Sequence, residues 1–268
     1  MTAKLAKIRP PVVERIVAIY CKPDEDKFQA NLTLWLDQIR KEFPIDATAT
    51  SWDIPIEYKV KDHVTVPVLS SLYPKARFIP RYWKRHPEGL KLFGFDVRAD
   101  RLVFRVAYDP TSQHTFDEII EEMKEWGPKW MEQFGVRSLT GVTVEYVNYL
   151  SPLTTPQFST PDNRGLSLGS AIRIFADIPG GHIRLTAPFD CKIGLLYDEE
   201  TPYVCNVSVI GPPQEQSTIH VLISVDTQKA GKQISLEQAL IEVRKGREIA
   251  NHQFRSIFTK FALDSFYA

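Results

Sequence analysis

The stretch GVTVEYVNYLS, Gly141–Ser151, is predicted to be the central strand of a sheet. Alternate residues of a strand point to opposite faces, and here both sets of alternate positions are largely apolar or aromatic. Such a strand is typically covered on both sides, so helices are expected to pack on the sheet around it. The two sets are Val142, Val144, Tyr146 and Asn148 on one face, and Thr143, Glu145, Val147 and Tyr149 on the other.

Three amphipathic helices are expected around this strand, because apolar residues recur at spacings of three and four within 25–43, 116–134 and 235–261. Gly127-Pro128 is expected to kink or split the second helix. Period-two alternation predicts the remaining strands, and 151–170 is expected to be a long loop. These strands lie at 12–20, in hairpins at 54–68 and 90–108, and in a meander at 171–175, 182–187, 192–197, 203–210 and 218–226.

The fold class that these elements indicate is α+β, with a mixed, mainly antiparallel sheet covered by three main helices over one domain, 1–268. The order of strand, acidic turn with proline, helix and further strands occurs from Val12 and again from Leu102. Two degenerate β-α-β-meander repeats, 10–98 and 99–268, would explain this recurrence. Chance recurrence of a common unit explains it equally well.

The composition excludes a global electrostatic attraction to nucleic acid or to an anionic membrane, since 33 Lys and Arg residues balance 33 Asp and Glu residues. The N-terminal stretch has only short apolar runs and resembles neither a signal peptide nor a spanning helix. We therefore expect a cytoplasmic protein without a membrane contact. Cys21, Cys191 and Cys205 are far apart and are expected to be small buried hydrophobic residues.

No catalytic residue, metal ligand or cofactor is predicted. A metal-dependent nuclease would need carboxylates and a lysine on neighbouring strands, whereas Asp53, Glu57 and Lys59 are expected to lie in one strand with a solvated face. A thiol nucleophile at Cys191 with His182 as its base has only a generic sequence signature. None of the six histidines has the spacing of a metal-ligand pair.

The basic segment 73–86, which is rich in aromatic residues, is the strongest local signal for binding. It has three interpretations: its rings enter the core while its charges pair with the acidic helix at 117–132, it binds a protein partner, or it binds single-stranded nucleic acid. The partner-binding residues predicted from it are Tyr73, Arg77, Arg81, Tyr82, Trp83, Lys84 and Arg85.

Three stretches together resemble a sporadically distributed prokaryotic family of uncharacterised proteins. They are the first strand PPVVERIVAIY, the central strand VTVEYVNYLSP, and Asn251-His252-Gln253-Phe254 followed by Phe258. In the family pattern an arginine precedes the Tyr-x-Asn of the central strand, whereas this chain has Glu145. The resemblance implies no catalytic residues. The patchy distribution implies defence-linked gene neighbourhoods, in which such proteins bind an effector, a toxin or a regulator.

These observations predict a non-enzymatic, protein-binding accessory or regulatory protein in a prokaryotic antiviral-defence (CRISPR-type) or toxin-regulation setting. The alternative is a nucleic-acid-binding protein or metal-dependent nuclease that uses the segment 73–86. The expected partner is therefore a protein, with nucleic acid as the competing expectation.

Overall fold

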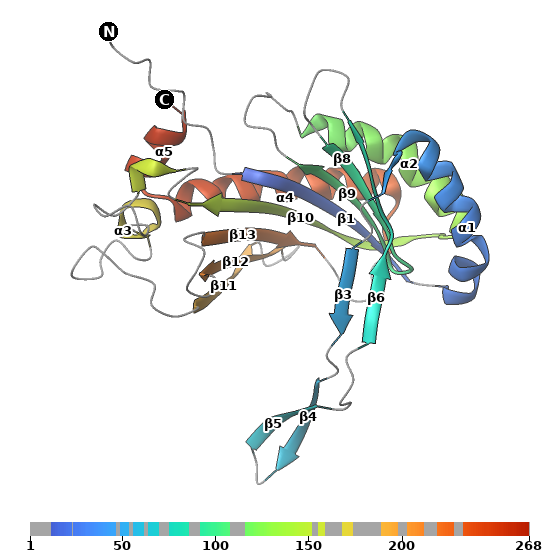
Figure 1. Ribbon diagram of the computed structural model, residues 1–268, viewed down its shortest axis with the longest axis horizontal. Coiled ribbons are helices and arrows are strands. Elements are labelled where there is room, and N and C mark those ends of the chain that lie inside the picture. Colours follow the sequence, from blue (N-terminus) through green and yellow to red (C-terminus); the bar gives the residue numbers. More distant parts are fainter. Residues whose placement is uncertain are drawn as a thin grey trace.

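Nine strands form one antiparallel sheet in the computed structural model (Figure 1). Their order from edge to edge is β11-β12-β13-β10-β1-β9-β8-β7-β2, and every neighbouring pair is antiparallel. The strands are β1 (Val12–Cys21), β2 (Ile45–Asp46), β7 (Arg81–Arg85), β8 (Leu92–Val97), β9 (Arg101–Ala107), β10 (Leu139–Leu150), β11 (Phe189–Tyr197), β12 (Tyr203–Gly211) and β13 (Ile219–Asp226). The structure describes residues 12–22, 24–46, 49–53, 56–61, 64–69, 75–85, 92–107, 116–151, 155–158, 168–173, 189–197, 203–211, 219–227 and 233–267.

Strand β10 lies inside the sheet between β13 and β1, as the sequence predicts. Val144 stands opposite Val17 of β1 and Val225 of β13, and all three side chains are fully buried. The opposite face of β10 is covered less completely, because Tyr149 is exposed. The prediction of two covered faces is therefore only partly correct, since the long helices all pack on one face.

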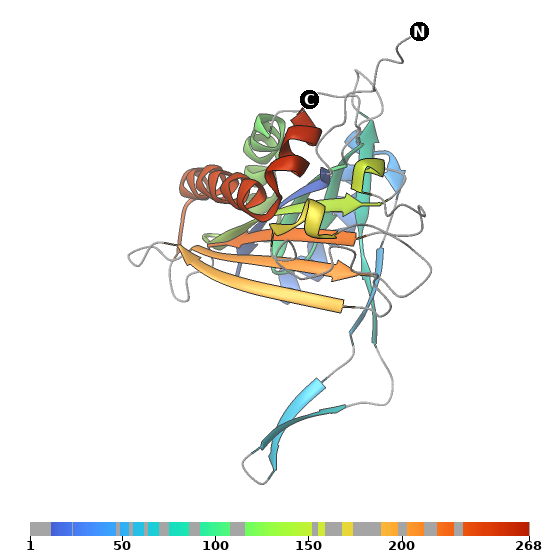
Figure 2. The same ribbon diagram turned by 90° about the vertical axis from the view of Figure 1, so that its left-hand side faces the viewer.

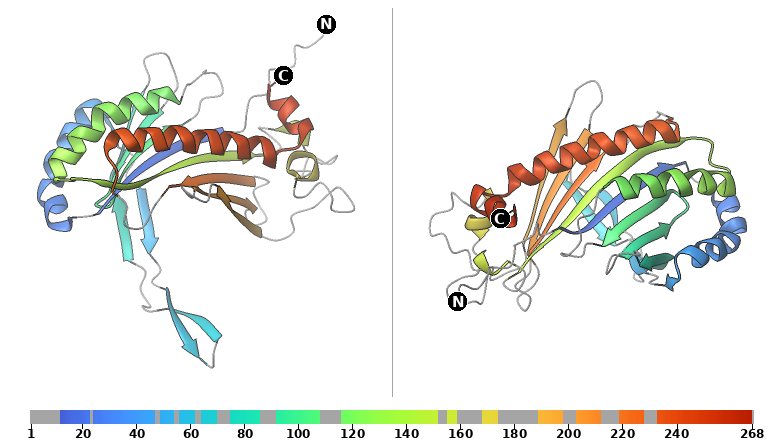
Figure 3. Two further views of the ribbon diagram at one scale, coloured as in Figure 1. Left: turned by 180° about the vertical axis from the view of Figure 1, so that it is seen from behind. Right: turned by 90° about the horizontal axis from the view of Figure 1, so that it is seen from above.

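Three long helices cover that face, which confirms the predicted α+β fold class (Figures 2 and 3). Their apolar stripes meet in an aromatic cluster, where the Trp35 ring lies within 6.2 Å of the rings of Phe95, Trp126 and Phe134, measured between centroids. The sequence places Asp24 before the first helix, and its side chain accepts a hydrogen bond from the Lys27 amide (3.1 Å). The helices are α1 (Glu25–Glu42), α2 (Asp117–Phe134) and α4 (Leu236–Ile257).

Helix α2 continues through Pro128, so a split at Gly127-Pro128 is not found. Trp126 and Trp130 lie on either side of the proline and are both buried. Packing of these two indoles against the core holds both halves of the helix on the sheet, which offsets the lost amide donor. Gly127 leaves room for Leu236, whose Cδ1 would lie 3.1 Å from a Cβ at this position.

The last predicted helix, 235–261, is two helices instead of one. Phe258 leaves the helical conformation (φ −81°, ψ 146°) and forms an isolated antiparallel bridge with Ile172. Thr259 then begins the next helix, because its hydroxyl accepts a hydrogen bond from the Ala262 amide (3.1 Å). This second helix is α5 (Lys260–Tyr267).

Two short helices lie in or next to the predicted loop 151–170. They are the 3₁₀ helix η1 (Pro156–Phe158) and α3 (Leu168–Ala171). Ala171 was expected to begin a strand at 171–175, but it ends α3, and its carbonyl accepts a hydrogen bond from the Thr259 amide (2.9 Å). The expected strand at 182–187 lies outside the described residues.

The sheet consists of a group of four strands and a group of five that meet at the β1–β10 pair. Strands β9, β8, β7 and β2 follow β1 outward on one side, and β13, β12 and β11 follow β10 outward on the other. A helix follows each group in the chain, α2 after β9 and α4 after β13. This arrangement separates the groups after Ala107, whereas the predicted boundary at 98/99 would separate the neighbouring strands β8 and β9. A duplication remains a prediction.

Two pairs of strands form an arm that projects from the sheet on the side away from the helices (Figures 1 and 2). The arm connects β2 to β7 near one edge of the sheet. Asp53 lies in one pair, and Glu57 and Lys59 lie in the other, so the expectation that they share one strand is wrong. The pairs are β3 (Ala49–Asp53) with β6 (Lys75–Ile79), and β4 (Ile56–Lys61) with β5 (Val64–Leu69).

Candidate functional site

The face of the sheet opposite the helices, here called the open face, has polar and charged side chains from seven adjacent strands. Val144 identifies the helix-covered face, because its side chain lies next to Gly246 of α4. Residues at the alternate positions of the strands therefore point to the open face. The polar ones among them include Arg81, Asp96, Arg101, Arg105, Glu14, Tyr20, Thr143, Glu145, Ser224, Asp226 and Asn206. The arm projects on the same side (Figure 1).

Four charged residues from four adjacent strands form a continuous ion network on the open face. Asp96 accepts hydrogen bonds from Arg81 Nε (2.7 Å) and Nη2 (3.0 Å), and from Arg105 Nε (2.8 Å). The Nη1 atom of Arg105 donates to Glu14 Oε1 (2.9 Å). Asp96 is only 2% exposed, so its charge depends on the two guanidinium groups for compensation. We call this set the Arg81–Asp96–Arg105–Glu14 network.

A second chain of polar contacts crosses the open face nearer to the start of β10. The Arg101 guanidinium lies 4.6 Å from the centroid of the Tyr20 ring and donates to its hydroxyl (3.2 Å). The hydroxyls of Tyr20 and Thr143 are hydrogen-bonded to each other (3.2 Å), and Thr143 donates to the Asp226 carboxylate. Asn206 Nδ2 also donates to Asp226 (3.4 Å). These residues come from five different strands.

Glu145 lies between these two sets of contacts, opposite Ile16 of β1. Within the described part of the chain, no side chain forms a hydrogen bond or an ion pair with its carboxylate. Burial raises the pKa of Glu145 above its usual value, Arg105 opposes this shift, and the negative charges of Glu14 and Asp226 increase it. Arg105 is already bonded to Asp96 and Glu14, so Glu145 is a carboxylate without a dedicated cation.

Replacing Glu145 by glutamine should change how stability depends on pH. The raised pKa means that the folded chain binds more protons than the unfolded chain between the ordinary value of 4.5 and the raised one. The free energy of unfolding contributed by Glu145 therefore falls as the pH rises through this interval. Urea unfolding from pH 4 to pH 8 should show the Gln variant more stable than the native protein at neutral pH. Glu248→Gln, an exposed change on α4, should leave the profile unaltered.

The predicted partner-binding residues are not brought together on one surface. Tyr73 lies outside the described residues, and Arg77 lies in β6 of the arm. Tyr82 and Trp83 are buried, with 2% and 9% exposure. Arg81 belongs to the ion network described above. The two rings therefore do not form an exposed stacking surface for bases.

The two remaining residues of this segment differ in their surroundings. Lys84 forms an ion pair with Glu122 of α2 and lies 4.6 Å from the Phe43 ring centroid. Arg85 is exposed. Tyr82 in the core and Lys84 paired with the acidic helix agree with the first interpretation, whereas Arg81 pairs with Asp96 of β8 and Trp83 lies against Gly94 on the open face. A partner-binding role of 73–86 remains a prediction.

Of the ion network, sequence reasoning singled out only Arg81, and it did so for partner binding. The available signal was a single charged residue inside a strand whose neighbouring residues are mostly apolar. Arg105 in RLVFRVA and Glu145 in VTVEYV are examples. Such residues normally face solvent, so the signal points to a network only when the order of the strands is known.

Cys21 and Cys205 are buried, as predicted. Cys21 and Cys205 are free thiols, and burial raises the pKa of each to about 12, with smaller contributions from Asp100 and Asp226 respectively. No group of three or more His, Cys, Asp or Glu residues in the described ranges is arranged to hold a metal ion. In those ranges, too, no helix combines the length and apolarity needed to span a membrane.

Comparisons with family models, curated proteins and solved structures find no match for this chain.

Proposed function

We propose that the chain is a non-enzymatic, protein-binding accessory or regulatory protein whose partner docks on the open face. The prokaryotic antiviral-defence or toxin-regulation setting belongs to the same proposal and rests on the family resemblance. In this proposal a lysine or arginine of the partner lies beside Glu145.

The observation that carries this proposal is the unmatched carboxylate in the centre of a face whose other described charges are largely paired. Arg81 and Arg105 form ion pairs with Asp96 and Glu14, so the charge of Arg105 compensates Glu145 only in part. A cation from a partner would supply the missing charge. Charge complementarity of this kind sets the orientation and the specificity of protein interfaces.

The arm supports docking on this side of the sheet. It extends from the β2–β7 edge and lies on the same side as the open face (Figures 1 and 2). A partner on the open face could therefore contact the sheet and the arm together. Standard protein interfaces bury about 800 Å² on each side, and two surfaces that meet at an angle provide such an area more readily than one flat face.

The proposal is tested by affinity purification from the native host with three tagged proteins: the native chain, Glu145→Lys and Glu248→Lys. Both variants make the same charge change, but Glu248 is exposed on α4, on the helix side of the sheet. The native chain and Glu248→Lys should retain one partner in stoichiometric amount. Glu145→Lys should weaken retention by about a hundredfold, because it places two like charges in contact.

Glu145→Gln controls for misfolding of the lysine variant, since it keeps the shape of the side chain. Its retention should lie between those of the native chain and Glu145→Lys. The absence of any stoichiometric partner would contradict a protein-binding function. Equal retention by all the variants would leave a binding function but contradict docking at Glu145.

The nucleic-acid alternative receives less support from the contacts. Arg81 and Lys84 are both in ion pairs with carboxylates, so they are not free to contact phosphates. Substituting Arg81, Lys84 and Arg85 by alanine should therefore lower stability more than it lowers nucleic-acid affinity. Salt-dependent retention of the native chain on single-stranded DNA or RNA, lost in this triple variant, would restore the alternative.

A further inference from the structure

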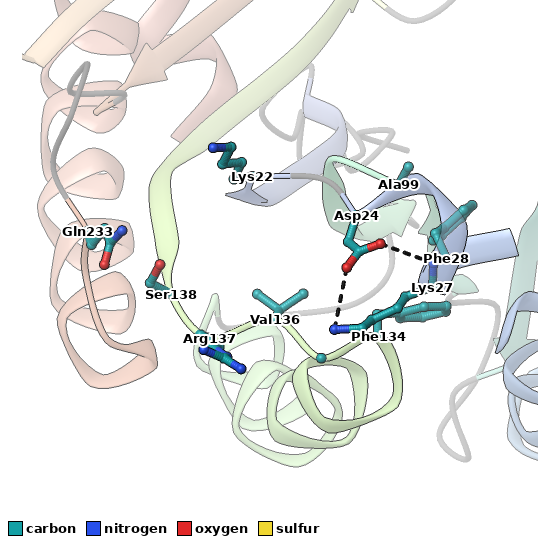
Figure 4. Close-up of a pocket in the computed structure, with 11 residues that line it drawn as sticks. Lys22, Asp24, Lys27, Phe28, Ala99, Phe134, Val136, Arg137, Ser138 and Gln233 are labelled. Carbon is teal, nitrogen blue, oxygen red and sulfur yellow. Dashed lines mark hydrogen bonds and ion pairs between the residues drawn. The ribbon is translucent and has the colours of Figure 1, made fainter. Parts of the chain in front are cut away.

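A polar hollow with a volume of about 510 Å³ lies at the end of the sheet where β1 ends and β10 begins, and Glu145 is not among its lining residues (Figure 4). Four parts of the chain form it: the end of β1 with the start of α1, the turn between β8 and β9, the segment between α2 and β10, and the residue Gln233 before α4. Its volume is in the range of small-molecule sites, which typically measure about 300 to 1,000 Å³.

The charged residues around the hollow are three cations and one carboxylate. The carboxylate, Asp24, accepts a hydrogen bond from the Lys27 amide (3.1 Å) and pairs with Lys27 Nζ (3.4 Å), as Figure 4 shows. The other two cations, Lys22 and Arg137, have no ion pair or side-chain hydrogen bond to any described residue. Three cations against one carboxylate leave a net charge of about +2 around the hollow.

Two carbonyls in the last turn of α2 accept hydrogen bonds from the residues that end the helix. The Gly135 amide donates to the Glu132 carbonyl (3.2 Å), and the Val136 amide donates to the Met131 carbonyl (2.8 Å). Gly135 has the left-handed conformation that ends a helix in this way (φ +64°). A Cβ at Gly135 would lie 3.3 Å from Lys27 Nζ, so the glycine lets Lys27 lie across the end of α2.

A minor part of the lining of the hollow is apolar and is here called the apolar floor. The rings of Phe28 and Phe134 pack together with their centroids 5.0 Å apart, and Ala99 and Val136 lie beside them. A cationic rim over such a floor matches a molecule with an anionic group and an organic body. A phosphate monoester carries a charge of about −1.5 to −2 at neutral pH, which matches the net charge of the rim.

We propose that this hollow binds a small organic phosphate monoester, with Lys22 and Arg137 as the principal phosphate contacts. The site is distinct from the open face and does not depend on the proposed partner. Because it joins α1, α2 and the start of β10, a bound ligand would stabilise the contact between the two helices.

Isothermal titration calorimetry at low salt, with adenosine monophosphate and inorganic phosphate as probes, tests the proposal. Both probes should give saturable binding to the native chain, with adenosine monophosphate several-fold tighter because of the apolar floor. The double variant Lys22→Ala/Arg137→Ala should weaken binding by about tenfold or more, which is the effect of losing charge-assisted hydrogen bonds. Both side chains are exposed, so circular dichroism should show an unchanged fold.

The control variant is Lys245→Ala/Arg255→Ala, which also removes two exposed cations, but from α4. Its affinity for both probes should stay within about twofold of the native value. The proposal is overturned if neither probe binds in the low-millimolar range, or if the control variant loses as much affinity as the hollow variant. Equal affinity for the two probes would overturn the claim that the ligand is organic.

Discussion

Replacing Asp96 by alanine is expected to lower the free energy of unfolding by about 3 to 5 kcal/mol. The carboxylate is almost fully buried and accepts three hydrogen bonds from Arg81 and Arg105. Its removal leaves the largely enclosed guanidinium groups of Arg81 and Arg105, on the two strands that flank β8, with only the Glu14 carboxylate to compensate their charge. Urea unfolding at pH 7 measures this loss. Asp96→Asn keeps the shape and one acceptor oxygen, and should cost less than the alanine variant.

A matched control for this change is Asp37→Ala in α1. Asp37 also pairs with an arginine, Arg40, at 3.4 Å, but both side chains are more than half exposed. Exposed ion pairs contribute little, so this variant should lose about 0.5 kcal/mol or less. A comparable loss in Asp37→Ala and Asp96→Ala would mean that the buried network contributes no more than a surface pair.

Replacing Trp35 by alanine should have an equally large effect, about 3 to 5 kcal/mol. The indole is fully buried between α1, α2 and β8, where it contacts Phe95, Trp126 and Phe134. Aromatic rings on three sides cannot collapse far into the space left behind, so most of the cavity should remain. Urea unfolding followed by circular dichroism, and not by tryptophan fluorescence, measures this loss.

Leu34→Ala is the control for the tryptophan variant. Leu34 precedes Trp35 in the same helix and is 56% exposed, so it loses little contact area on truncation. The expected change is within about 0.5 kcal/mol. If both variants unfolded at the same urea concentration, the aromatic cluster would not be the core that holds α1 on the sheet.

Much of the fold could be predicted from the period of the apolar residues. The spacing of Phe28, Trp35 and Ile39 indicates α1, and the two apolar faces of 141–151 indicate an interior strand. The predicted end of the last helix was wrong because Phe258 continues the apolar stripe of α4. A tertiary contact, the bridge to Ile172, decides its conformation there instead.

The candidate site could not be predicted in the same way, because its partners come from strands that are far apart in the chain. Arg105 and Glu14 meet only because β9 lies beside β1, a pairing across about ninety residues that no local pattern encodes. For the segment 73–86, in contrast, the sequence suggested a site where the structure brings no exposed cluster together. Its local composition suggests a binding surface, but once β7 has paired with β8 Tyr82 enters the core and the Trp83 ring lies flat against Gly94 on the open face.

The junction of the two strand groups at β1 and β10 has a consequence for the integrity of the chain. A polypeptide cut between Ala107 and Phe116 would give two fragments, each with a bare edge strand of ten or twelve residues. Uncovered edges of this length recruit other strands and lead to aggregation. Each fragment produced alone should therefore precipitate, whereas the two produced together should recombine by pairing β1 with β10.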